Sequence, residues 1–390
     1  MYAKRNVLMN SPKLITPLDF ISWIVIAVVA VIVLAINNLG DPARMGATVA
    51  YIYPAMGDVS NVWFSSVDDP SNQEQVTFTD YGIYDFAVSA DGQYLAYSER
   101  IEPTGLHEIM LMNLNNRQIT QITNCVADEA DCRAPTFRPT GNAVAYERLN
   151  TNTGVGTGIG VTRIWLADLS SVPYDNQPLS QDDNFVGYQP TWAADGNSLA
   201  FYSSDIANPG ILVYNFNPNA GDQTLKFVPS LNNAVGALSP NGSQLVFPEY
   251  NRRPDGNAYS YLRIADLEGL EFVDLTNPED NIDDIQSQWF PNGEQIAIVR
   301  RYTDERYSQG FQLYTLDLRD MGVQPLLVDE AYSHGFFSFD ATGTMIVLQR
   351  FQLGGNNAVG VWVLNVETNT LTQMIENAFH PRWVVGGQPN

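Results

Sequence analysis

The chain has 390 residues, and its excess of acidic over basic side chains gives a formal net charge of −23 at pH 7. Proteins neutralise the phosphate backbone of nucleic acids with Lys and Arg, so we expect no nucleic-acid partner for so acidic a chain. The length would accommodate two or three ordinary domains, although a single all-β repeat fold can also occupy all of it.

An apolar segment near the N-terminus predicts a membrane-spanning helix over residues 19–39. Phe20 to Ile36 is apolar apart from Ser22, and about 20 helical residues suffice to cross the core of a bilayer. A cleaved signal peptide is the alternative. Against it, the apolar run is longer than the usual run of about 7 to 15 residues, and Asn37-Asn38-Leu39 replaces a small-residue cleavage site.

Basic residues ahead of this segment set the predicted orientation. Lys4, Arg5 and Lys13 precede it, so the positive-inside rule places residues 1–18 in the cytoplasm. We therefore expect a single-pass protein of the cell membrane. Residues 40–46 form a linker in this interpretation, and residues 47–390 form a domain on the extracytoplasmic side.

A ten-residue motif, Trp192 to Phe201, recurs along most of the chain. Its centre, Asp195-Gly196, predicts a two-residue type I′ hairpin turn, because both residue types tolerate a positive φ. Copies centre on Asp91-Gly92, Thr140-Gly141, Asn241-Gly242, Asn292-Gly293 and Thr342-Gly343, so the glycines recur at steps of 49, 55, 46, 51 and 50 residues. A period of this size predicts an all-β propeller with one four-stranded blade for each repeat.

A third strand follows each hairpin and ends in Asp or Asn plus an apolar residue. These endings are Asn113-Leu114, Asp168-Leu169, Asn215-Phe216, Asp266-Leu267, Asp317-Leu318 and Asn365-Val366. A turn and a fourth strand come next, as in 118–123, 224–228, 272–276 and 371–375. Alternating polarity with aromatic and β-branched residues supports strands throughout.

The two ends of the repeat region complement each other. Pro381-Arg382-Trp383 matches the first strand of a repeat but lacks the rest of its blade, whereas Val49-Ala50-Tyr51 matches a second strand and is followed by strands at 61–65 and 75–79. Together they would complete a seventh blade and leave no open sheet edge. The alternative is a six-bladed propeller with a loose N-terminal hairpin.

The Asp-Gly hairpins, the Asp-Leu turns and Leu-Thr endings such as Leu275-Thr276 together resemble the TolB-like, WD40-like (PD40-type) propeller repeat, over residues 47 to 385. The resemblance implies the fold, a protein-binding habit and a bacterial origin. The chain departs from TolB itself, because no α/β domain precedes the propeller and an apparent membrane anchor replaces a cleavable signal. The role of TolB is therefore not carried over.

Strand directions alternate within a blade, so the loops between second and third strands emerge on the same face as the links between blades. The long loops 100–106, 150–162, 250–260, 302–310 and 351–360 all belong to this face. Loops on a rigid scaffold are where binding sites usually lie. We therefore expect the binding surface on this face.

Carboxylates crowd the links that lead into the first strands. They are Asp80, Asp85, Asp128, Glu129, Asp131, Asp182, Asp183, Glu279, Asp280, Asp283, Asp284, Asp329, Glu330 and Glu376. A ring of like charge would attract a divalent cation or a basic partner protein to the channel mouth, with Asp283, Asp284, Asp329 and Glu330 as candidate contacts. Simple solvation of loops in an acidic protein is the alternative.

Basic residues are concentrated in the loops of two neighbouring blades. Arg252, Arg253, Arg300, Arg301 and Arg306 could together bind a carboxylate-bearing surface of a partner. The alternative is that they pair with nearby acids such as Asp255, Asp304 and Glu305.

Histidines and cysteines offer few further candidates. His334 and His380 lie near the starts of adjacent first strands and could hold a divalent metal or relay protons, or simply line a polar channel. Cys125 and Cys132 close a short loop and could form a disulfide outside the cytoplasm, with free thiols as the alternative.

Common catalytic motifs are absent from the sequence: it contains no G-x-S-x-G elbow, P-loop or H-E-x-x-H. We expect no cofactor and no enzymatic activity. The sequence favours a membrane-anchored, extracytoplasmic platform or scaffold that binds proteins, such as an accessory subunit of a larger membrane complex. The alternatives are a lyase or hydrolase at the channel mouth, or a small-ligand or sugar binder that uses Tyr302, Tyr307 and Tyr332.

Overall fold

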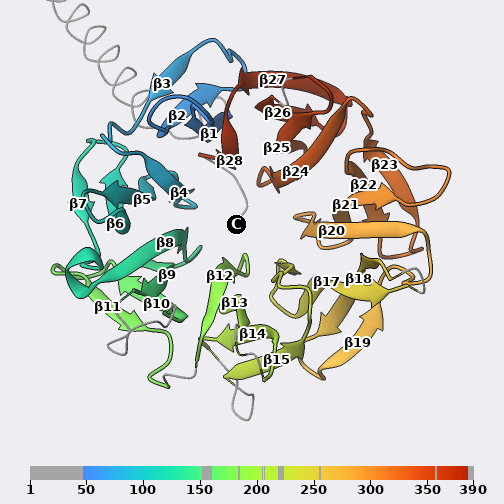
Figure 1. Ribbon diagram of the computed structural model, residues 1–390, viewed down its shortest axis with the longest axis horizontal. Coiled ribbons are helices and arrows are strands. Elements are labelled where there is room, and N and C mark those ends of the chain that lie inside the picture. The colour runs from blue at the N-terminus through green and yellow to red at the C-terminus, as the bar shows by residue number, and fades with distance from the viewer. Residues whose placement is uncertain are drawn as a thin grey trace, which may run out of the picture. The chain divides into compact units, whose positions relative to one another are not determined.

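The computed structural model describes residues 47–151, 160–182, 185–203, 205, 207–217, 224–253, 256–355 and 358–384. Within them, strands β1 to β28 form seven four-stranded antiparallel sheets arranged around a centre (Figure 1). The predicted seven-bladed all-β propeller is confirmed, and the six-bladed alternative is wrong. The predicted membrane helix at 19–39, tail 1–18 and linker 40–46 lie outside the described residues. None of the helices in the described part is long and apolar enough to cross a membrane.

In each blade the first strand lies nearest the centre and the fourth lies at the periphery (Figure 1). The first three complete blades in chain order are β4 (Ile83–Val88), β5 (Tyr94–Ile101), β6 (Leu106–Asn113) and β7 (Ile119–Gln121); β8 (Ala130–Phe137), β9 (Ala143–Asn150), β10 (Thr162–Asp168) and β11 (Asp175–Pro178); and β12 (Gly187–Trp192), β13 (Ser198–Ser203), β14 (Gly210–Asn215) and β15 (Leu225–Pro229). A short 3-10 helix, η2 (Val126–Asp128), links β7 to β8.

The next three blades follow the same order. They are β16 (Ala237–Leu238), β17 (Gln244–Arg252), β18 (Ala258–Asp266) and β19 (Glu271–Asp274); β20 (Ile282–Trp289), β21 (Gln295–Tyr302), β22 (Gln312–Asp317) and β23 (Val323–Leu327); and β24 (Tyr332–Phe339), β25 (Met345–Gln352), β26 (Val359–Asn365) and β27 (Thr370–Glu376).

The seventh blade combines both ends of the repeat region. Its order is β28 (Phe379–Trp383), β1 (Thr48–Tyr53), β2 (Asn61–Ser66) and β3 (Gln73–Gln75). Val49 lies opposite Trp383 in the antiparallel ladder, and the Val384 N–H donates to the Thr48 carbonyl at 3.0 Å. Val49 and Tyr51 are fully buried and pack with Trp383 and the neighbouring β25 and β26. The predicted closure is correct, although the fourth strand is displaced from the expected 75–79.

The turns between first and second strands differ from the predicted type I′ turns. In the blade of β4, the Gly92 N–H donates to the Ser89 carbonyl at 2.8 Å, and Gly92 has a φ of 66° whereas Asp91 does not have a positive φ. The Asp91 carboxylate instead accepts the Gln93 N–H at 3.0 Å. The side chains of Asp195, Asn241, Asn292 and Thr342 accept the equivalent N–H. The residue before the glycine thus acts as a side-chain acceptor.

In three blades, a Thr that follows an apolar residue at the end of the fourth strand fastens this strand to its neighbour. The Thr276 hydroxyl oxygen accepts the Leu262 N–H at 2.8 Å, beyond the point where the β18–β19 ladder ends. Thr77 and Thr123 accept the equivalent N–H groups of β2 and β6 at 2.9 and 2.8 Å. A buried N–H that would otherwise lack a partner is satisfied in each case, which explains why this residue pair recurs.

Irregular backbone in the first strands shapes the channel. The register shifts within β4, β8, β12, β20 and β24, and where β28 pairs with β1. Ala134, Gln189, Phe336 and His380 have φ values of 50°, 60°, 43° and 50°, and Gly236 ahead of the two-residue β16 has 78°. Bulges bend a strand and redirect its side chains. These residues all line the central channel.

Candidate functional site

The first strands enclose a cavity of about 470 Å³ in the centre of the ring. Asp85, Glu147, Gln189, Ile285, Phe336, His380 and Arg382 are among its lining residues. A smaller cavity of about 210 Å³ adjoins it and is also lined by Thr191, Gly236, Gln286, Ser287, Phe336 and Arg382. Because these residues line both cavities, the two form one channel.

The charged groups of the channel form few internal pairs. The His380 Nδ1 lies 3.4 Å from the Asp85 Oδ1, and the His380 ring stacks on Phe336 with ring centroids 4.6 Å apart. The Arg382 guanidinium lies 4.5 Å from the centre of the Phe336 ring and donates to the adjacent Pro381 carbonyl. Burial lowers the pKa of Arg382, and the charge of Asp85 opposes this effect.

Glu147 is the second carboxylate in the channel. Its Oε1 accepts the Gln189 N–H at 2.7 Å. Burial raises the pKa of Glu147; the Gln189 hydrogen bond acts against this rise, and the nearby charge of Asp85 adds to it. A carboxylate of this kind, held in a cavity, is typical of functional sites, although ion-pair networks produce similar shifts.

Three of the four candidate carboxylates at the channel mouth pair with arginines within the protein. Asp284 is fully buried and accepts two hydrogen bonds from Arg300, Nε to Oδ1 at 2.7 Å and Nη2 to Oδ2 at 2.8 Å. The two residues lie opposite each other across β20 and β21, as do Asp283 and Arg301, whose Nη2 and Oδ2 are 2.9 Å apart. Asp329 pairs with the buried Arg350. Glu330 is exposed in the link before β24.

The arginine-rich sector is similarly occupied by local contacts. Besides Arg300 and Arg301, Arg306 pairs with Asp304 and lowers the pKa of that carboxyl to about 2 through a side-chain hydrogen bond. Arg253 donates to the Thr303 hydroxyl at 3.1 Å and lies over the Tyr259 ring. Arg252 is exposed. Local acids therefore hold three of the five arginines, and Asp283 and Asp284 are the partners of two of them.

His334 is only 2% exposed, and neither of its ring nitrogens has a hydrogen-bond partner. Burial, reinforced by the charge of Arg350, lowers the pKa of His334 to about 3, so the ring is neutral near pH 7. Over the described ranges, no three His, Cys, Asp or Glu side chains lie together as a metal site would require. His380 lines the channel instead, beside Asp85.

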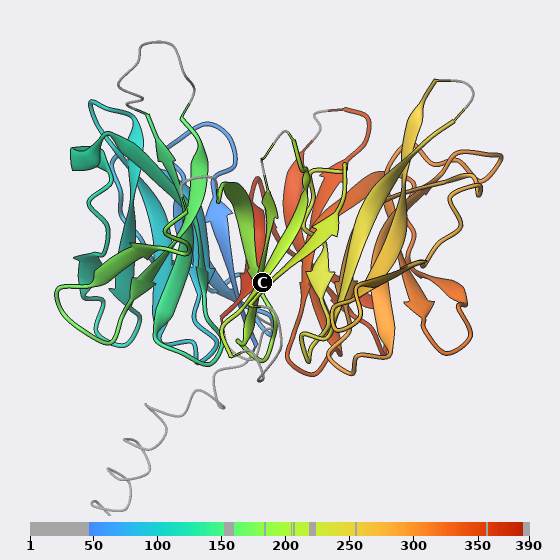
Figure 2. The same ribbon diagram turned by 90° about the horizontal axis from the view of Figure 1, so that it is seen from below.

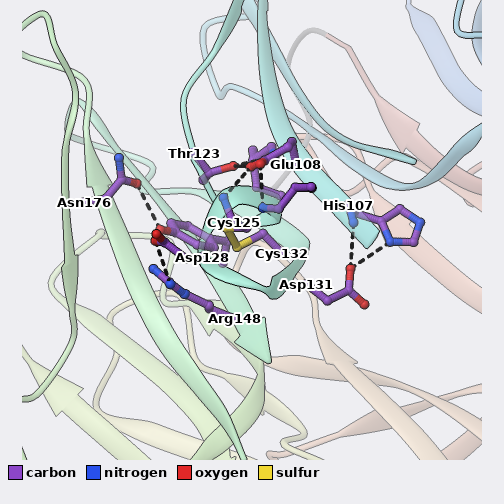
Figure 3. The surroundings of a disulfide bond; sticks show 12 residues. His107, Glu108, Thr123, Cys125, Asp128, Asp131, Cys132, Arg148 and Asn176 are labelled. Carbon is purple, nitrogen blue, oxygen red and sulfur yellow. Dashed lines mark hydrogen bonds and ion pairs between the residues drawn. A yellow bond between two sulfur atoms is a disulfide. The ribbon is translucent and has the colours of Figure 1, made fainter. Parts of the chain in front are cut away.

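Cys125 and Cys132 are joined in a disulfide, with Cα atoms 6.0 Å apart (Figure 3). The Glu108 carboxylate lies beside it and accepts the Cys125 N–H at 2.8 Å, the Val126 N–H at 2.7 Å and the Thr123 hydroxyl at 2.5 Å. These bonds attach the disulfide loop to β6. Because Cys132 lies in β8, the disulfide also ties this loop to a first strand, and first strands form the channel wall.

One polar pair was missed by the sequence analysis. The His107 Nδ1 lies 2.8 Å from the Asp131 Oδ1, which also accepts the His107 backbone N–H at 2.9 Å (Figure 3). Burial acts to raise the pKa of Asp131, but the hydrogen bonds from His107 and the charge of Arg133 outweigh it, and the pKa is lowered. The two residues are 24 positions apart in neighbouring blades, so no short motif could reveal them.

Exposed apolar side chains gather on one face of the propeller. We call the face with the second-to-third-strand loops and the links between blades the loop face, which is the upper side in Figure 2, and the opposite one the turn face. The large exposed apolar residues at the loop face or its channel mouth are Met56, Val59, Phe78, Tyr81, Tyr84, Val161, Leu231, Tyr250, Ile285, Tyr307, Val328 and Phe351. Of the described residues, the large exposed apolar ones at the turn face are Val172, Met321 and Ile119, which begins β7; Phe227 and Val273 lie on the outer strands β15 and β19.

The densest group lies on the seventh blade and the blade of β4. Met56 and Val59 belong to the β1–β2 loop, Phe78 and Tyr81 to the β3–β4 link, and Tyr84 to β4. We call these five residues the apolar patch. Val59, Tyr81 and Tyr84 also line a cavity of about 550 Å³ that reaches His107. Large exposed apolar groups that cluster in this way mark interaction surfaces.

No protein-family model matches the sequence, and no curated protein is significantly similar to it. Among solved structures, the chain is similar to TolB from Acinetobacter baumannii, with 16% identity and a TM-score of 0.50 over 89% of this chain and 68% of that one. A prolyl endopeptidase gives 14% identity and a TM-score of 0.60 over 84% of this chain and 47% of its own. An oligogalacturonate lyase in complex with manganese gives 13% identity and a TM-score of 0.52 over 84% of each chain.

These likenesses show the fold alone, because the identities are low. The TolB-like propeller predicted from the repeats is therefore confirmed as an architecture. The chain spans about half the length of the prolyl endopeptidase. The same architecture occurs in proteins with different names and activities, so function has to be argued from the surface and the channel of this chain.

Proposed function

We propose that this protein is a membrane-anchored, extracytoplasmic propeller that binds a partner protein through its loop face and does not itself catalyse a reaction. The observation that carries the proposal is the uneven distribution of exposed apolar side chains between the two faces. Phe78 is 76% exposed and lies in the β3–β4 link. Aromatic and Met side chains in such positions are typical of the centres of protein interfaces.

The charges around the apolar patch indicate the kind of partner. Asp58 lies in the β1–β2 loop and Asp80 in the β3–β4 link, beside Phe78 and Tyr81. Together with the net charge of −23, these acids favour a partner that presents an apolar centre surrounded by basic side chains. Membrane attachment is supported by the sequence alone, through the helix predicted at residues 19–39.

Internal pairing of charged groups supports a binding role over a catalytic one. Asp131, Asp283, Asp284 and Asp329 each have a basic partner within the protein, so these carboxylates are already engaged. Catalysis needs acids and bases that can exchange protons with a substrate. The second candidate function, a hydrolase or lyase acting in the channel, is favoured by one observation, the raised pKa of Glu147 in the central cavity.

Site-specific photo-crosslinking of the full-length protein in its native membrane tests the proposal. A crosslinking amino acid at Phe78 or Tyr81 should capture one stoichiometric protein, because both side chains would lie at the centre of the interface. The same group at Val172 or Met321, which are 83% and 47% exposed on the turn face, is the control and should not capture it. Equal capture from both faces would contradict a loop-face site. Turnover of a glycan or peptide that is lost in Glu147→Gln would support the enzyme instead.

A further inference from the structure

We propose that the central channel binds a free apolar α-amino acid, with its carboxylate on Arg382 and its ammonium group facing Asp85 and Glu147. This small-ligand site is separate from the loop-face site proposed above. The inference rests on an arginine that lacks an acidic ion-pair partner, on two acids from the next two blades that line the same cavity, and on the apolar residues that share this lining.

Arg382 is the first element of this site. Among the described residues it has no acidic partner within ion-pair distance, in contrast to Arg300 and Arg350. A guanidinium group has five N–H donors, and the hydrogen bond to the Pro381 carbonyl at 3.3 Å uses one of them. Arg382 is partly buried and lines both cavities. A partly desolvated cation without a partner is costly to maintain, and an anionic ligand would relieve that cost.

Carboxylates are the natural partners of an arginine fork, because two parallel N–H groups match their two oxygens. Gln286, Ser287 and Thr191 line both cavities next to Arg382 and can supply further polar contacts. Arg382 shares both cavity linings with these polar residues, so a carboxylate bound to it could accept further hydrogen bonds from them.

A simple anion would nevertheless be disfavoured in this channel. Asp85 and Glu147 line the larger cavity and not the smaller one, so a ligand bound at Arg382 from the larger cavity shares that cavity with both acids. Asp85 acts on the charge of Arg382 without forming an ion pair with it. A group that carries both charges a few atoms apart, as an α-amino acid does, would fit between them. Its ammonium group would also compensate the burial that raises the pKa of Glu147.

The rest of the cavity indicates an apolar side chain. Phe336 is stacked with His380 and lies under the Arg382 guanidinium, and Ile285 is 40% exposed toward the channel. Val235, Pro190 and Pro248 add further apolar surface. A volume of about 470 Å³ lies within the range of small-molecule sites, so an aromatic amino acid can be accommodated.

Calorimetric titration of the full-length protein in mild detergent, with L-phenylalanine as the probe, tests the inference. The matched comparison ligands are 3-phenylpropionate, which lacks the ammonium group, and phenethylamine, which lacks the carboxylate. Each should bind about 10- to 100-fold more weakly, because each loses one charge-assisted contact. The dipeptide Gly-Phe, whose charges lie further apart, should also bind more weakly; tighter binding would assign the site to a peptide end and overturn the proposal.

Two channel variants and one surface variant complete the test. Arg382→Gln should abolish detectable L-phenylalanine binding, and Glu147→Gln should weaken it about tenfold. Arg319→Gln is the control, since Arg319 pairs with Asp317 on the exterior, and it should bind normally. If Arg382→Gln does not fold, Arg382→Lys is the alternative test. It retains the positive charge but lacks the arginine fork, so it should bind L-phenylalanine more weakly. Equal affinity for the three phenyl ligands, or normal affinity in folded Arg382 variants, would overturn the proposal. Crosslinking at Phe78 is a separate readout, so either proposal can fail alone.

Discussion

Cross-strand register determines which acidic and basic side chains of neighbouring strands form ion pairs. The sequence places Asp283 and Asp284 at the start of a first strand and Arg300 and Arg301 at the end of a second strand, and both pairs were candidate partner contacts. In the sheet they lie directly opposite each other and form ion pairs. The residue types and their face could be predicted, but the pairing could not, because the register depends on the length of the turn and on the bulge after Asp284.

The channel residues were partly visible in the sequence. His380 was a candidate for a metal or a polar channel lining and Asp85 belonged to the acidic links, whereas Arg382 was named only as part of the first-strand match at Pro381-Arg382-Trp383. Glu147 did not stand out, because it lies in a second strand where an outward-facing acid is ordinary. It reaches the channel because Gln189 of the next blade adopts a left-handed φ of 60° and donates its N–H to the carboxylate. This kind of contact between blades has no local sequence pattern.

His334 predicts a pH dependence of stability. Burial lowers its pKa to about 3 in the folded protein, whereas the unfolded chain has the ordinary value of about 6.5. Between these values the unfolded state binds more protons, so the free energy of unfolding should fall as the pH decreases through this window. The slope from one proton is at most about 1.4 kcal/mol per pH unit.

Urea denaturation between about pH 7 and about pH 5 measures this dependence. His334→Phe retains a ring of similar size and removes the titrating group, so its free energy of unfolding should depend less on pH than that of the wild type. Carboxylates titrate equally in both proteins, and the difference between the two slopes isolates His334. Parallel curves for the two proteins would show that this imidazole does not titrate as its burial requires.

At the scale of strands and turns, the repeats were read correctly and the turn geometry was not. Asp and Asn before a glycine tolerate a positive φ, but they also accept backbone N–H groups, and sequence alone does not distinguish these two uses. In the structure Asp91 accepts the Gln93 N–H and leaves the positive φ to Gly92. The Thr after a fourth strand likewise accepts a backbone N–H, as Thr276 does from Leu262. The sequence showed that this Thr recurs but not what it binds.

The loop between β7 and β8 predicts a measurable effect of its disulfide. Cys125 and Cys132 are separated by 7 positions, and closing so short a loop should stabilise the protein by about 2 to 3 kcal/mol, chiefly by restricting the unfolded chain. Replacing both cysteines by Ala should lower the free energy of unfolding by this amount in urea denaturation. Reductant should destabilise the wild type similarly and leave the double variant unchanged. A wild type that is indifferent to reductant would contradict the prediction.

The whole ring depends on one strand that comes from the far end of the described chain. β28 covers β1, and Trp383 packs with Val49 and Tyr51 while its indole N–H donates to the Ser338 carbonyl at 3.1 Å. This closure was predictable because Pro381-Arg382-Trp383 matched a first strand that had no partner nearby. Which cavity the closed ring would enclose was not predictable, because it depends on the bulges of all the first strands.

Removing β28 should destabilise the entire propeller. A chain truncated after Ala378 loses the burial of Trp383, and removing one large core side chain costs about 3 to 5 kcal/mol. We expect a lower and broader thermal transition in circular dichroism. A synthetic peptide of residues 379–390 should restore it in part, whereas the same peptide carrying Trp383→Ser should not. A truncated chain that melts like the full-length protein would contradict this account of closure.

Pairing of β1 with β28 also has a consequence during synthesis on the ribosome. β1 emerges early, but its partner follows more than 300 residues later, which takes roughly 15 to 65 s at about 5–20 residues per second. Throughout that time the nascent chain carries an unpaired edge that exposes Val49 and Tyr51. A chaperone that shields such edges would therefore be most needed before residue 379 is translated, and a premature stop codon shortly ahead of it would disable blades that had already been made.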